Sequence, residues 1–278
     1  MIESKEKELL EFIGKFKSVL VAFSGGLDSS VVLWASIKAL GAENVLAVTS
    51  ESASFASSEG ISAREAAREV GLPPDRHIFI RTEEMNNPDY VKNPSNRCYY
   101  CKSELFSQLK KIAEQKNIEA VFDGANVSDN SDFRPGQRAA QRLEIVSPLK
   151  EGGFDKEMLR ELARKYELSF AERPAAACLA SRIPYGTRIT VERLKKVETA
   201  EAAVRAMGFE GFRVRYHGEV ARLELRPDDI KSVIDNGTRE KLVTEIKKAG
   251  FKFVALDLEG YRTGSLNRML TEGEKDNA

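Results

Sequence analysis

Short apolar runs alternate with longer amphipathic segments along the first half of the chain. The short runs are rich in β-branched and aromatic side chains, as buried strands are, and the longer segments have apolar positions at helical spacing. Strands and helices in alternation form βαβ units around a parallel sheet. The strand candidates are residues 18–23, 44–49, 76–80, 119–124 and 145–149, and the helix candidates are residues 1–16, 31–40, 57–70, 98–112 and 155–166.

The pattern changes near residue 175. Two prolines and a glycine between residues 174 and 186 indicate a loop, and later two strands follow each other directly around residue 217, which predicts a hairpin. We therefore predict an α/β parallel-sheet domain over residues 1–175 and a smaller α+β domain over residues 176–270. The polar residues 271–278 are expected to be disordered. The elements expected in the second domain are a helix over 190–207, strands over 212–217 and 219–226, a helix over 228–249 and a strand over 252–259.

Composition excludes several classes of protein. The 278 residues include 43 Lys+Arg and 43 Asp+Glu, so the charge balance gives no general signature of nucleic-acid binding. No apolar run approaches the length of a membrane span, and the charged N-terminus does not resemble a signal peptide. We therefore expect a cytoplasmic protein that does not contact membranes. Three cysteines are an odd number, which argues against a disulfide framework and favours metal binding or catalysis.

The S-G-G-L-D-S-S turn after the first strand candidate has the composition of a phosphate-binding site. Gly25 and Gly26 allow backbone N–H groups to face one point, and the N-terminus of the following helix adds donors and a partial positive charge. The hydroxyls of Ser24 and Ser29 can donate as well. The alternative is a plain glycine-rich turn in which Asp28 and Ser29 only cap a helix.

A second polar segment, with the pattern D-G-x-N-x-x-D, follows the fourth strand candidate. Ligands of parallel sheets bind beyond the carboxyl ends of the strands, so Asn126 and Asp129 are placed for ligand contact. The alternative is that Asp123, Asn126 and Asp129 only shape a turn.

The cysteines support several interpretations. Cys98-x-x-Cys101 alone fits a redox pair, half of a zinc site or part of an iron–sulfur site. Zinc normally takes four ligands, and only Cys178, His77 and His217 could complete such a set. Three thiolates fit a [4Fe–4S] cluster with one iron left for an exogenous ligand, and the remaining alternative is three unrelated cysteines. We expect both histidines to be structural.

Two arginines suggest a second anion site in the C-terminal domain. Arg213 and Arg215 lie two positions apart on a predicted strand, so both side chains point to the same face. Paired guanidinium groups suit a phosphate monoester. The alternative is a solvated strand face.

Four polar residues are weaker candidates. Ser181 and Arg182 adjoin Cys178 in sequence and are candidates for the same site. Glu201 and Glu224 could ligate an additional metal there, or could equally be surface carboxylates.

The S-G-G-x-D-S turn resembles the phosphate loop of the N-type ATP-pyrophosphatase (PP-loop) superfamily, whose members cleave ATP between the α- and β-phosphates and adenylate a substrate. Further motifs extend the resemblance over about residues 1–270, to the LarE family of ATP-dependent sulfur transferases. Those motifs are Asn126-Val127-Ser128-Asp129, Arg134-Pro135-Gly136, Cys178-Leu179-Ala180-Ser181-Arg182 and Tyr185-Gly186.

The resemblance implies a two-step reaction. Carboxyl groups of pyridinium-3,5-biscarboxylic acid mononucleotide are adenylated with release of pyrophosphate, and sulfur then displaces AMP to give thiocarboxylates for a nickel-pincer cofactor. One branch of the family uses a sacrificial cysteine at the position of Cys178, which becomes dehydroalanine. A second branch has three cysteines and carries sulfide on a [4Fe–4S] cluster. Cys98 and Cys101 give this sequence the three-cysteine pattern.

The resemblance also implies site residues, cofactors and partners. Asp28 is expected to help bind Mg²⁺, an external donor is expected to supply sulfide, and the chain is expected to form a homo-oligomer, a hexamer in the family. The residues implied for ATP are Ser24, Gly25, Gly26, Asp28, Ser29, Asn126 and Asp129. Those implied for the substrate phosphate are Arg213, Arg215, Ser181 and Arg182, and those implied for the cluster and sulfur transfer are Cys98, Cys101 and Cys178.

Three other functions remain open from the sequence. A tRNA thiolase would also combine a phosphate loop with cysteines, but the chain has no recognisable RNA-binding module and no positive net charge. An amide-forming enzyme such as NAD synthetase would need no cysteines. A nucleotide sensor would bind ATP without releasing pyrophosphate.

Overall fold

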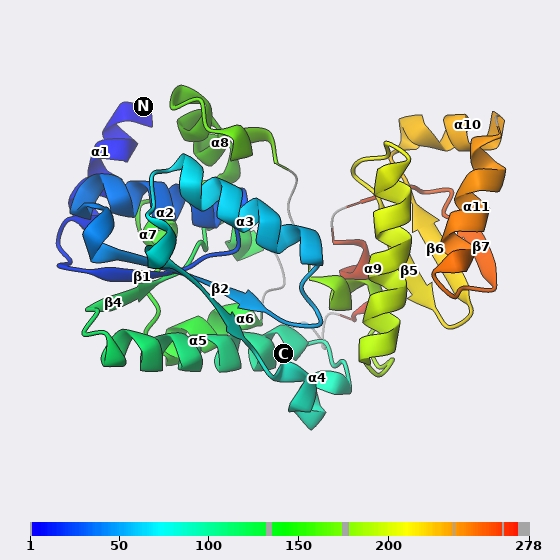
Figure 1. The fold of residues 1–278 in the computed structure, drawn as a ribbon, viewed down its shortest axis with the longest axis horizontal. Coiled ribbons are helices and arrows are strands. Elements are labelled where there is room, and N and C mark those ends of the chain that lie inside the picture. Colours follow the sequence, from blue (N-terminus) through cyan, green and yellow to red (C-terminus); the bar gives the residue numbers. More distant parts are fainter. Residues whose placement is uncertain (1, 132–134, 174–177, 236, 263, 272–278) are drawn as a thin grey trace. The chain divides into compact units, whose positions relative to one another are not determined.

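The computed structural model describes residues 2–131, 135–173, 178–235, 237–262 and 264–271, and these form two units (Figure 1). The first unit comprises Met1–Glu84 and Asn96–Ala176, and the second comprises Met85–Ser95 and Ala177–Ala278. The sequence places a single division near residue 175, whereas in the structure a segment from inside the first domain groups with the second unit. Arg134 and the expected disorder of residues 272–278 lie outside the described residues.

The first unit is built on a parallel sheet. Its strands lie in the order β3-β2-β1-β4, and β1 pairs with both β2 and β4. The predicted strand over residues 145–149 is reduced to a single parallel bridge between Val146 and Phe122, because Pro148 begins the short helix α7. The strands are β1 (Val19–Ala22), β2 (Val45–Glu51), β3 (His77–Arg81) and β4 (Ala120–Phe122).

Helices cover both faces of this sheet (Figure 1). Val19 and Val21 of β1 pack into the core beneath α1, α2, α3, α7 and α8, whereas Leu20 packs on the opposite face beneath α5 and α6. Side chains of successive strand residues point to opposite faces, so an unbroken apolar strand indicates a sheet buried on both sides. The helices are α1 (Ile2–Ile13), α2 (Leu27–Leu40), α3 (Ser57–Glu69), α5 (Arg97–Gln115), α6 (Gly136–Arg142), α7 (Pro148–Glu151) and α8 (Lys156–Lys165).

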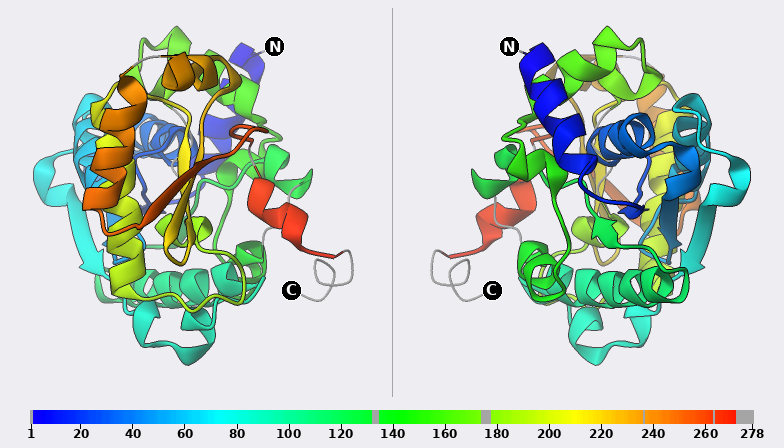
Figure 2. Two further views of the ribbon diagram at one scale, coloured as in Figure 1. Left: turned by 90° about the vertical axis from the view of Figure 1, so that its right-hand side faces the viewer. Right: turned by 90° about the vertical axis from the view of Figure 1, so that its left-hand side faces the viewer.

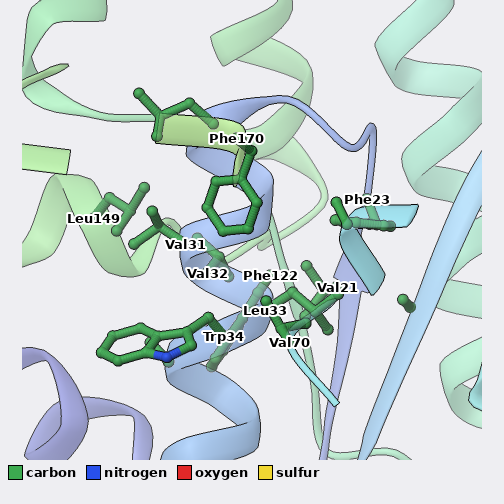
Figure 3. Close-up of a cluster of buried hydrophobic side chains, with 14 of the residues drawn as sticks. Val21, Phe23, Val31, Val32, Leu33, Trp34, Val70, Phe122, Leu149 and Phe170 are labelled. Carbon is green, nitrogen blue, oxygen red and sulfur yellow. The ribbon is translucent and has the colours of Figure 1, made fainter. Parts of the chain in front are cut away.

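Helix α2 is the centre of the larger core. The side chains of Val31, Val32 and Leu33 are fully buried, and Phe170 and Leu149 lie against this helix (Figure 3). Such a helix is apolar nearly all round, as a helix enclosed by its neighbours is. The packing therefore fixes α2, and with it the turn at its N-terminus. The α/β prediction is confirmed.

A buried carboxylate ties three helices of the first unit together. Glu6 of α1 accepts hydrogen bonds from Lys38 of α2 at 2.7 Å, from Lys165 of α8 at 2.9 Å and from Tyr166. Burial alone would raise the pKa of Glu6, but these three hydrogen bonds outweigh it and lower the pKa to about 2. The carboxylate therefore stays ionised, and α1 and α8 lie alongside α2 (Figure 2).

The second unit contains a three-stranded sheet in the order β5-β6-β7 (Figure 2). Strands β5 and β6 form the predicted hairpin, and β7 runs parallel to β6. The predicted helix over 228–249 is two helices with Gly237 between them. The elements are α4 (Pro88–Val91), α9 (Val191–Ala206), β5 (Arg213–His217), β6 (Val220–Glu224), α10 (Pro227–Asp235), α11 (Thr238–Lys248) and β7 (Phe253–Leu256).

Asn93 explains why residues 85–95 belong to this unit. Its buried side-chain amide donates to the carbonyls of Ile183, Pro184 and Thr187 at 3.2, 2.8 and 3.1 Å. Ile189 N–H also donates to a carbonyl of the same segment, that of Val91, at 2.8 Å. These bonds fix the inserted segment to the loop that precedes α9. None of the helices in the described part of the chain is long and apolar enough to cross a membrane.

Candidate functional site: a phosphate loop and a cysteine–arginine region

The turn between β1 and α2 has a conformation that only glycine allows at its second position. Gly25 has a φ of +75°, and a Cβ there would lie 2.6 Å from Cα of Ala63 in α3. Both the left-handed backbone and the close approach exclude a side chain. The way in which the loop passes α3 therefore requires glycine at position 25.

Serine hydroxyls hold the loop from inside. Ser29 Oγ accepts a hydrogen bond from Ser24 N at 3.2 Å, lies 3.1 Å from Ser24 Oγ and donates to Gly26 O at 3.2 Å. No side chain caps α2 at Gly26. Ser29 Oγ bonds to backbone groups of the loop, and the loop lies at the start of α2, where helices bind anions.

The second polar segment packs directly against the start of α2. A Cβ on Gly124 would lie 2.9 Å from Ser29 N and 3.2 Å from Asp28 C, so the two motifs meet backbone to backbone. Asp123 Oδ1 accepts from Ala125 N at 3.1 Å and from Ser147 Oγ at 2.7 Å. The sequence motifs are therefore parts of one site at the carboxyl edge of the sheet.

Asn126 and Asp129 shape a turn, and the turn leaves one buried polar group of Asn126 without a hydrogen bond among the described residues. Asn126 Oδ1 accepts from Ser128 N at 3.0 Å, and Asp129 Oδ2 accepts from Asn126 N at 3.2 Å. Asn126 is fully buried, and its Nδ2 has no hydrogen-bond partner within the described part of the chain. A buried donor without a partner is costly unless a ligand or water satisfies it, so the turn alone does not account for the amide.

Sequence reasoning missed two residues of the loop environment. The motif D-G-x-N-x-x-D contains Gly124 without singling it out, and the sequence gives no indication of Arg173, whose Nη1 donates to Gly25 O at 2.9 Å. The glycine in D-G-x-N was a usable signal, because glycine beside a phosphate loop often marks close backbone approach. Arg173 follows the 3₁₀ turn Ser169–Glu172 far along the chain, and no local signal connects it to the loop.

The structure brings Cys98 and Cys101 together in the first turn of α5. Cys98 is exposed and Cys101 is half-buried. Gly136, the first residue of α6, packs against this turn, since a Cβ there would be 3.0 Å from Cγ of Lys102 and 3.6 Å from Cys98 O. Within the ranges that the structure describes, no three His, Cys, Asp or Glu side chains form a group that could hold a metal ion.

Cys178 belongs to the second unit, where it is exposed and precedes the 3₁₀ turn Leu179–Arg182. Its carbonyl accepts from Arg182 Nη1 at 3.1 Å, and the same nitrogen donates to Ser181 Oγ at 3.0 Å. Arg215 of β5 donates to Ser181 O at 2.8 Å. The predicted substrate residues Ser181, Arg182 and Arg215 are thus in one cluster with the cysteine backbone.

Two carboxylates in this cluster are engaged by arginines. Glu201 accepts two hydrogen bonds from Arg182 at 2.8 and 2.9 Å, and Glu224 accepts two from Arg215 at 3.0 and 2.8 Å. All four side chains are nearly fully buried. Glu201 and Glu224 are therefore not surface carboxylates, and any metal there would compete with the guanidinium groups for the same oxygens.

Arg213 lies in β5 two positions before Arg215, with Tyr261 beneath its guanidinium at 4.9 Å from the ring centre. Burial lowers the pKa of Arg213, and the positive charge of Arg182 lowers it further. The cluster thus contains three guanidinium groups, of Arg182, Arg213 and Arg215, and two carboxylates, of Glu201 and Glu224.

The surroundings of both histidines lower the pKa and so favour a neutral ring. Thr49 Oγ1 lies 2.8 Å from His77 Nε2, and burial together with the charge of Arg64 lowers the pKa of His77 to about 4. The pKa of His217 is also lowered, first by burial and then by Arg222.

Comparison with known proteins identifies the family. No family model matches the chain. An uncharacterised Synechocystis protein is 40% identical over 98% of this chain and 100% of its own. Pyridinium-3,5-bisthiocarboxylic acid mononucleotide synthase of Lactiplantibacillus plantarum is 33% identical over 98% of this chain and 97% of its own. A probable tRNA sulfurtransferase of Methanosarcina mazei is 24% identical over 60% of this chain and 43% of its own. With its phosphate loop and a match to the synthase over nearly all of both chains, this protein belongs to the LarE family of ATP-dependent sulfur transferases.

Proposed function

We propose that this protein adenylates the carboxylates of pyridinium-3,5-biscarboxylic acid mononucleotide and replaces AMP with sulfur. The proposal rests on the contact of Gly124 with the start of α2, which joins the two nucleotide motifs, in a chain that matches the synthase over nearly its whole length. A carboxylate oxygen attacks the α-phosphate of ATP, the bond to the β-phosphate breaks, and pyrophosphate leaves. Sulfide then attacks the acyl carbon, and AMP leaves with the electron pair of the C–O bond.

In this proposal the phosphate loop binds the pyrophosphate that departs. Backbone N–H groups of Gly25 and Gly26 and the hydroxyls of Ser24 and Ser29 would stabilise the charge that develops on it. Asp28 would hold Mg²⁺ at the start of α2, where the ion neutralises phosphate charge. The buried Nδ2 of Asn126 would donate to the nucleotide, and Asp129, through the Asn126 N–H, would keep that amide in place.

Variants of the phosphate loop test the adenylation step. We expect Asp28→Ala and Ser29→Ala to abolish ATP-dependent pyrophosphate release while their circular dichroism spectra stay unchanged. Ser36→Ala is a matched control, because Ser36 lies on the same helix and its hydroxyl donates to Val32 O at 2.7 Å, away from the loop. Normal pyrophosphate release by folded Asp28→Ala and Ser29→Ala would contradict the assignment of the loop.

The arginine cluster of the second unit would bind the phosphate of the mononucleotide. Arg213, Arg215, Ser181 and Arg182 would supply the donors, and three guanidinium groups within one cluster would attract a phosphate. We expect the double variant Arg213→Ala, Arg215→Ala to bind the mononucleotide far more weakly and ATP almost normally. An equal loss of both ligands would indicate general destabilisation instead.

Cys98, Cys101 and Cys178 are proposed to hold a [4Fe–4S] cluster. The i, i+3 spacing of Cys98 and Cys101 in the first turn of α5 suits two ligands of one cluster, and the helix N-terminus favours anionic thiolates. When bound, such a cluster supplies an iron without a protein ligand, on which exogenous sulfide can be delivered. The alternative for this family is a sacrificial Cys178.

Mass spectrometry after turnover separates the two sulfur sources. If the three thiols share a cluster, each single Cys→Ala variant should lose bound iron and sulfur transfer but retain adenylation, and the protein should turn over repeatedly with sulfide. Dehydroalanine at position 178, together with full activity of the Cys98→Ala, Cys101→Ala double variant, would refute the cluster hypothesis.

The remaining expectations belong to the same proposal. A homo-oligomer, by family resemblance a hexamer, with an external sulfide donor in the cytoplasm is the expected setting. A tRNA substrate is less well supported, because the similarity to the tRNA sulfurtransferase covers 43% of that protein and the net charge here is zero.

A further inference from the structure

Arg173 contacts the outer side of the phosphate loop. Its Nη1 donates to the carbonyl of Gly25 at 2.9 Å and to the carbonyl of Ser62 in α3 at 3.2 Å. Ser62 precedes Ala63, the residue whose backbone excludes a side chain at Gly25. One guanidinium thus joins the loop to the helix against which the loop packs.

This contact determines where the next backbone donor points. The peptide bond between Gly25 and Gly26 is trans, and in a planar trans peptide the C=O and the N–H point in opposite directions. Because Gly25 C=O points to Arg173, Gly26 N–H points away from it, into the loop. The hydrogen bond from Gly26 N to Ser24 Oγ at 3.4 Å agrees with this orientation.

The positive charge of the guanidinium adds to the geometric effect. A hydrogen bond from a charged donor is stronger than one between neutral groups, and it polarises the peptide that accepts it. Electron density drawn toward Gly25 O leaves Gly26 N–H a stronger donor. Glycine at both positions makes the peptide plane easy to rotate. The hydrogen bond from Arg173 restricts that rotation.

We propose that Arg173 is a positioning residue that fixes the Gly25–Gly26 peptide so that Gly26 N–H faces the bound pyrophosphate. The inference rests on the proposed function of the loop, but it concerns a residue outside the loop. Arg173 acts through the peptide and need not touch the nucleotide.

Titration calorimetry with inorganic pyrophosphate and Mg²⁺, and separately with AMP, tests the proposal on the full chain. Arg173→Met keeps the length of the stem and removes the charge and the donors. We expect pyrophosphate to bind about tenfold more weakly, the effect of one lost charge-assisted hydrogen bond, and AMP to bind within about twofold of normal. Arg173→Lys keeps the charge but not the fork of donors, so its affinity for pyrophosphate should be intermediate. Arg164→Met is the matched control, since Arg164 is exposed and its ion pairs, with Glu157 and Glu172, are both outside the loop.

Each outcome decides the question. Absence of pyrophosphate binding by the unaltered protein would overturn the proposed function itself. Normal pyrophosphate affinity of Arg173→Met, in a protein that otherwise binds pyrophosphate, would overturn only the role of Arg173. Equal weakening of pyrophosphate and AMP would show a merely structural cross-link and would also overturn it. If Arg173→Met does not fold, Arg173→Lys must show the same preferential loss of pyrophosphate affinity for the proposal to stand.

Discussion

Replacing Gly124 with alanine tests whether the two nucleotide motifs act as one site. Gly124 does not have a positive φ, so alanine is compatible with its backbone, and the only obstacle is space. The new Cβ would lie 2.9 Å from Ser29 N and 3.2 Å from both Asp28 C and Ser29 Cα, several tenths of an ångström short of the ordinary contact distance of 3.4 Å. These neighbours are backbone atoms, so the start of α2 must move.

The expected effects on stability and on activity differ. Overpacking of this kind costs about 1–3 kcal/mol of the free energy of unfolding. Displacing groups that stabilise the departing pyrophosphate by a fraction of an ångström should reduce the rate of ATP-dependent pyrophosphate release by about 10–100-fold. A urea melt measures the first quantity, and a coupled pyrophosphate assay measures the second.

Gly60→Ala is the matched control for this substitution. Gly60 lies inside α3, and a Cβ there would meet its nearest neighbour, Nη1 of Arg64, at an ordinary 3.6 Å. Because alanine favours helices, we expect this variant to gain about 0.5–1 kcal/mol and to keep its activity. Pyrophosphate release by Gly124→Ala at the unaltered rate would refute the reasoning that the contact positions the loop.

Three further predictions concern ionisable side chains in the interior. Glu201→Gln leaves the guanidinium of Arg182 buried without its carboxylate, so urea unfolding should show a loss of about 3–5 kcal/mol; a loss below about 1 kcal/mol would contradict the buried pair. The pKa of His77 is about 4 in the folded protein and 6.5 ordinarily, so its contribution to stability is present above pH 6.5 and is lost as the pH falls toward 4. His77→Gln should flatten this part of the stability–pH curve, and an unchanged curve would argue against burial of the neutral ring. The pKa of Glu6 is about 2 against an ordinary 4.5, so its contribution to stability is present above pH 4.5 and is lost as the pH falls to 2. Glu6→Gln should remove that acid-sensitive component in melts at pH 5 and pH 3. An equal loss of stability between the two pH values in both proteins would count against the network around Lys38.

Local sequence patterns predict most of the fold and the phosphate loop. Strands such as Val19–Ala22 are apolar on both faces, and the glycine-rich turn depends on backbone freedom, so both leave signals within a few residues. The strand predicted over residues 145–149 is too long, because Pro148 suits the first turn of a helix as well as the end of a strand.

Features that depend on contacts across the chain could not be read in the same way. The pairing of Arg182 with Glu201 joins residues 19 positions apart, and the bond from Arg173 to Gly25 joins residues 148 positions apart. A carboxylate that binds a metal and one that binds a guanidinium have the same one-letter code. Only the fold distinguishes them, so the sequence alone does not decide whether Glu201 and Glu224 bind a metal or a guanidinium group.

The hydrogen bonds of Asn93 have a consequence for synthesis of the chain on the ribosome. Asn93 and its first partner, Ile183, are 90 positions apart, so the segment 85–95 is made well before the loop that it joins. At about 5–20 residues per second, the amide of Asn93 waits roughly 5–20 s for its acceptors. During that time the nascent chain has completed the strands of the first unit around an insert without its partners. A fragment that ends at residue 175 would remain in that state permanently, because it contains Asn93 but none of the three carbonyls, of Ile183, Pro184 and Thr187, that accept from its amide.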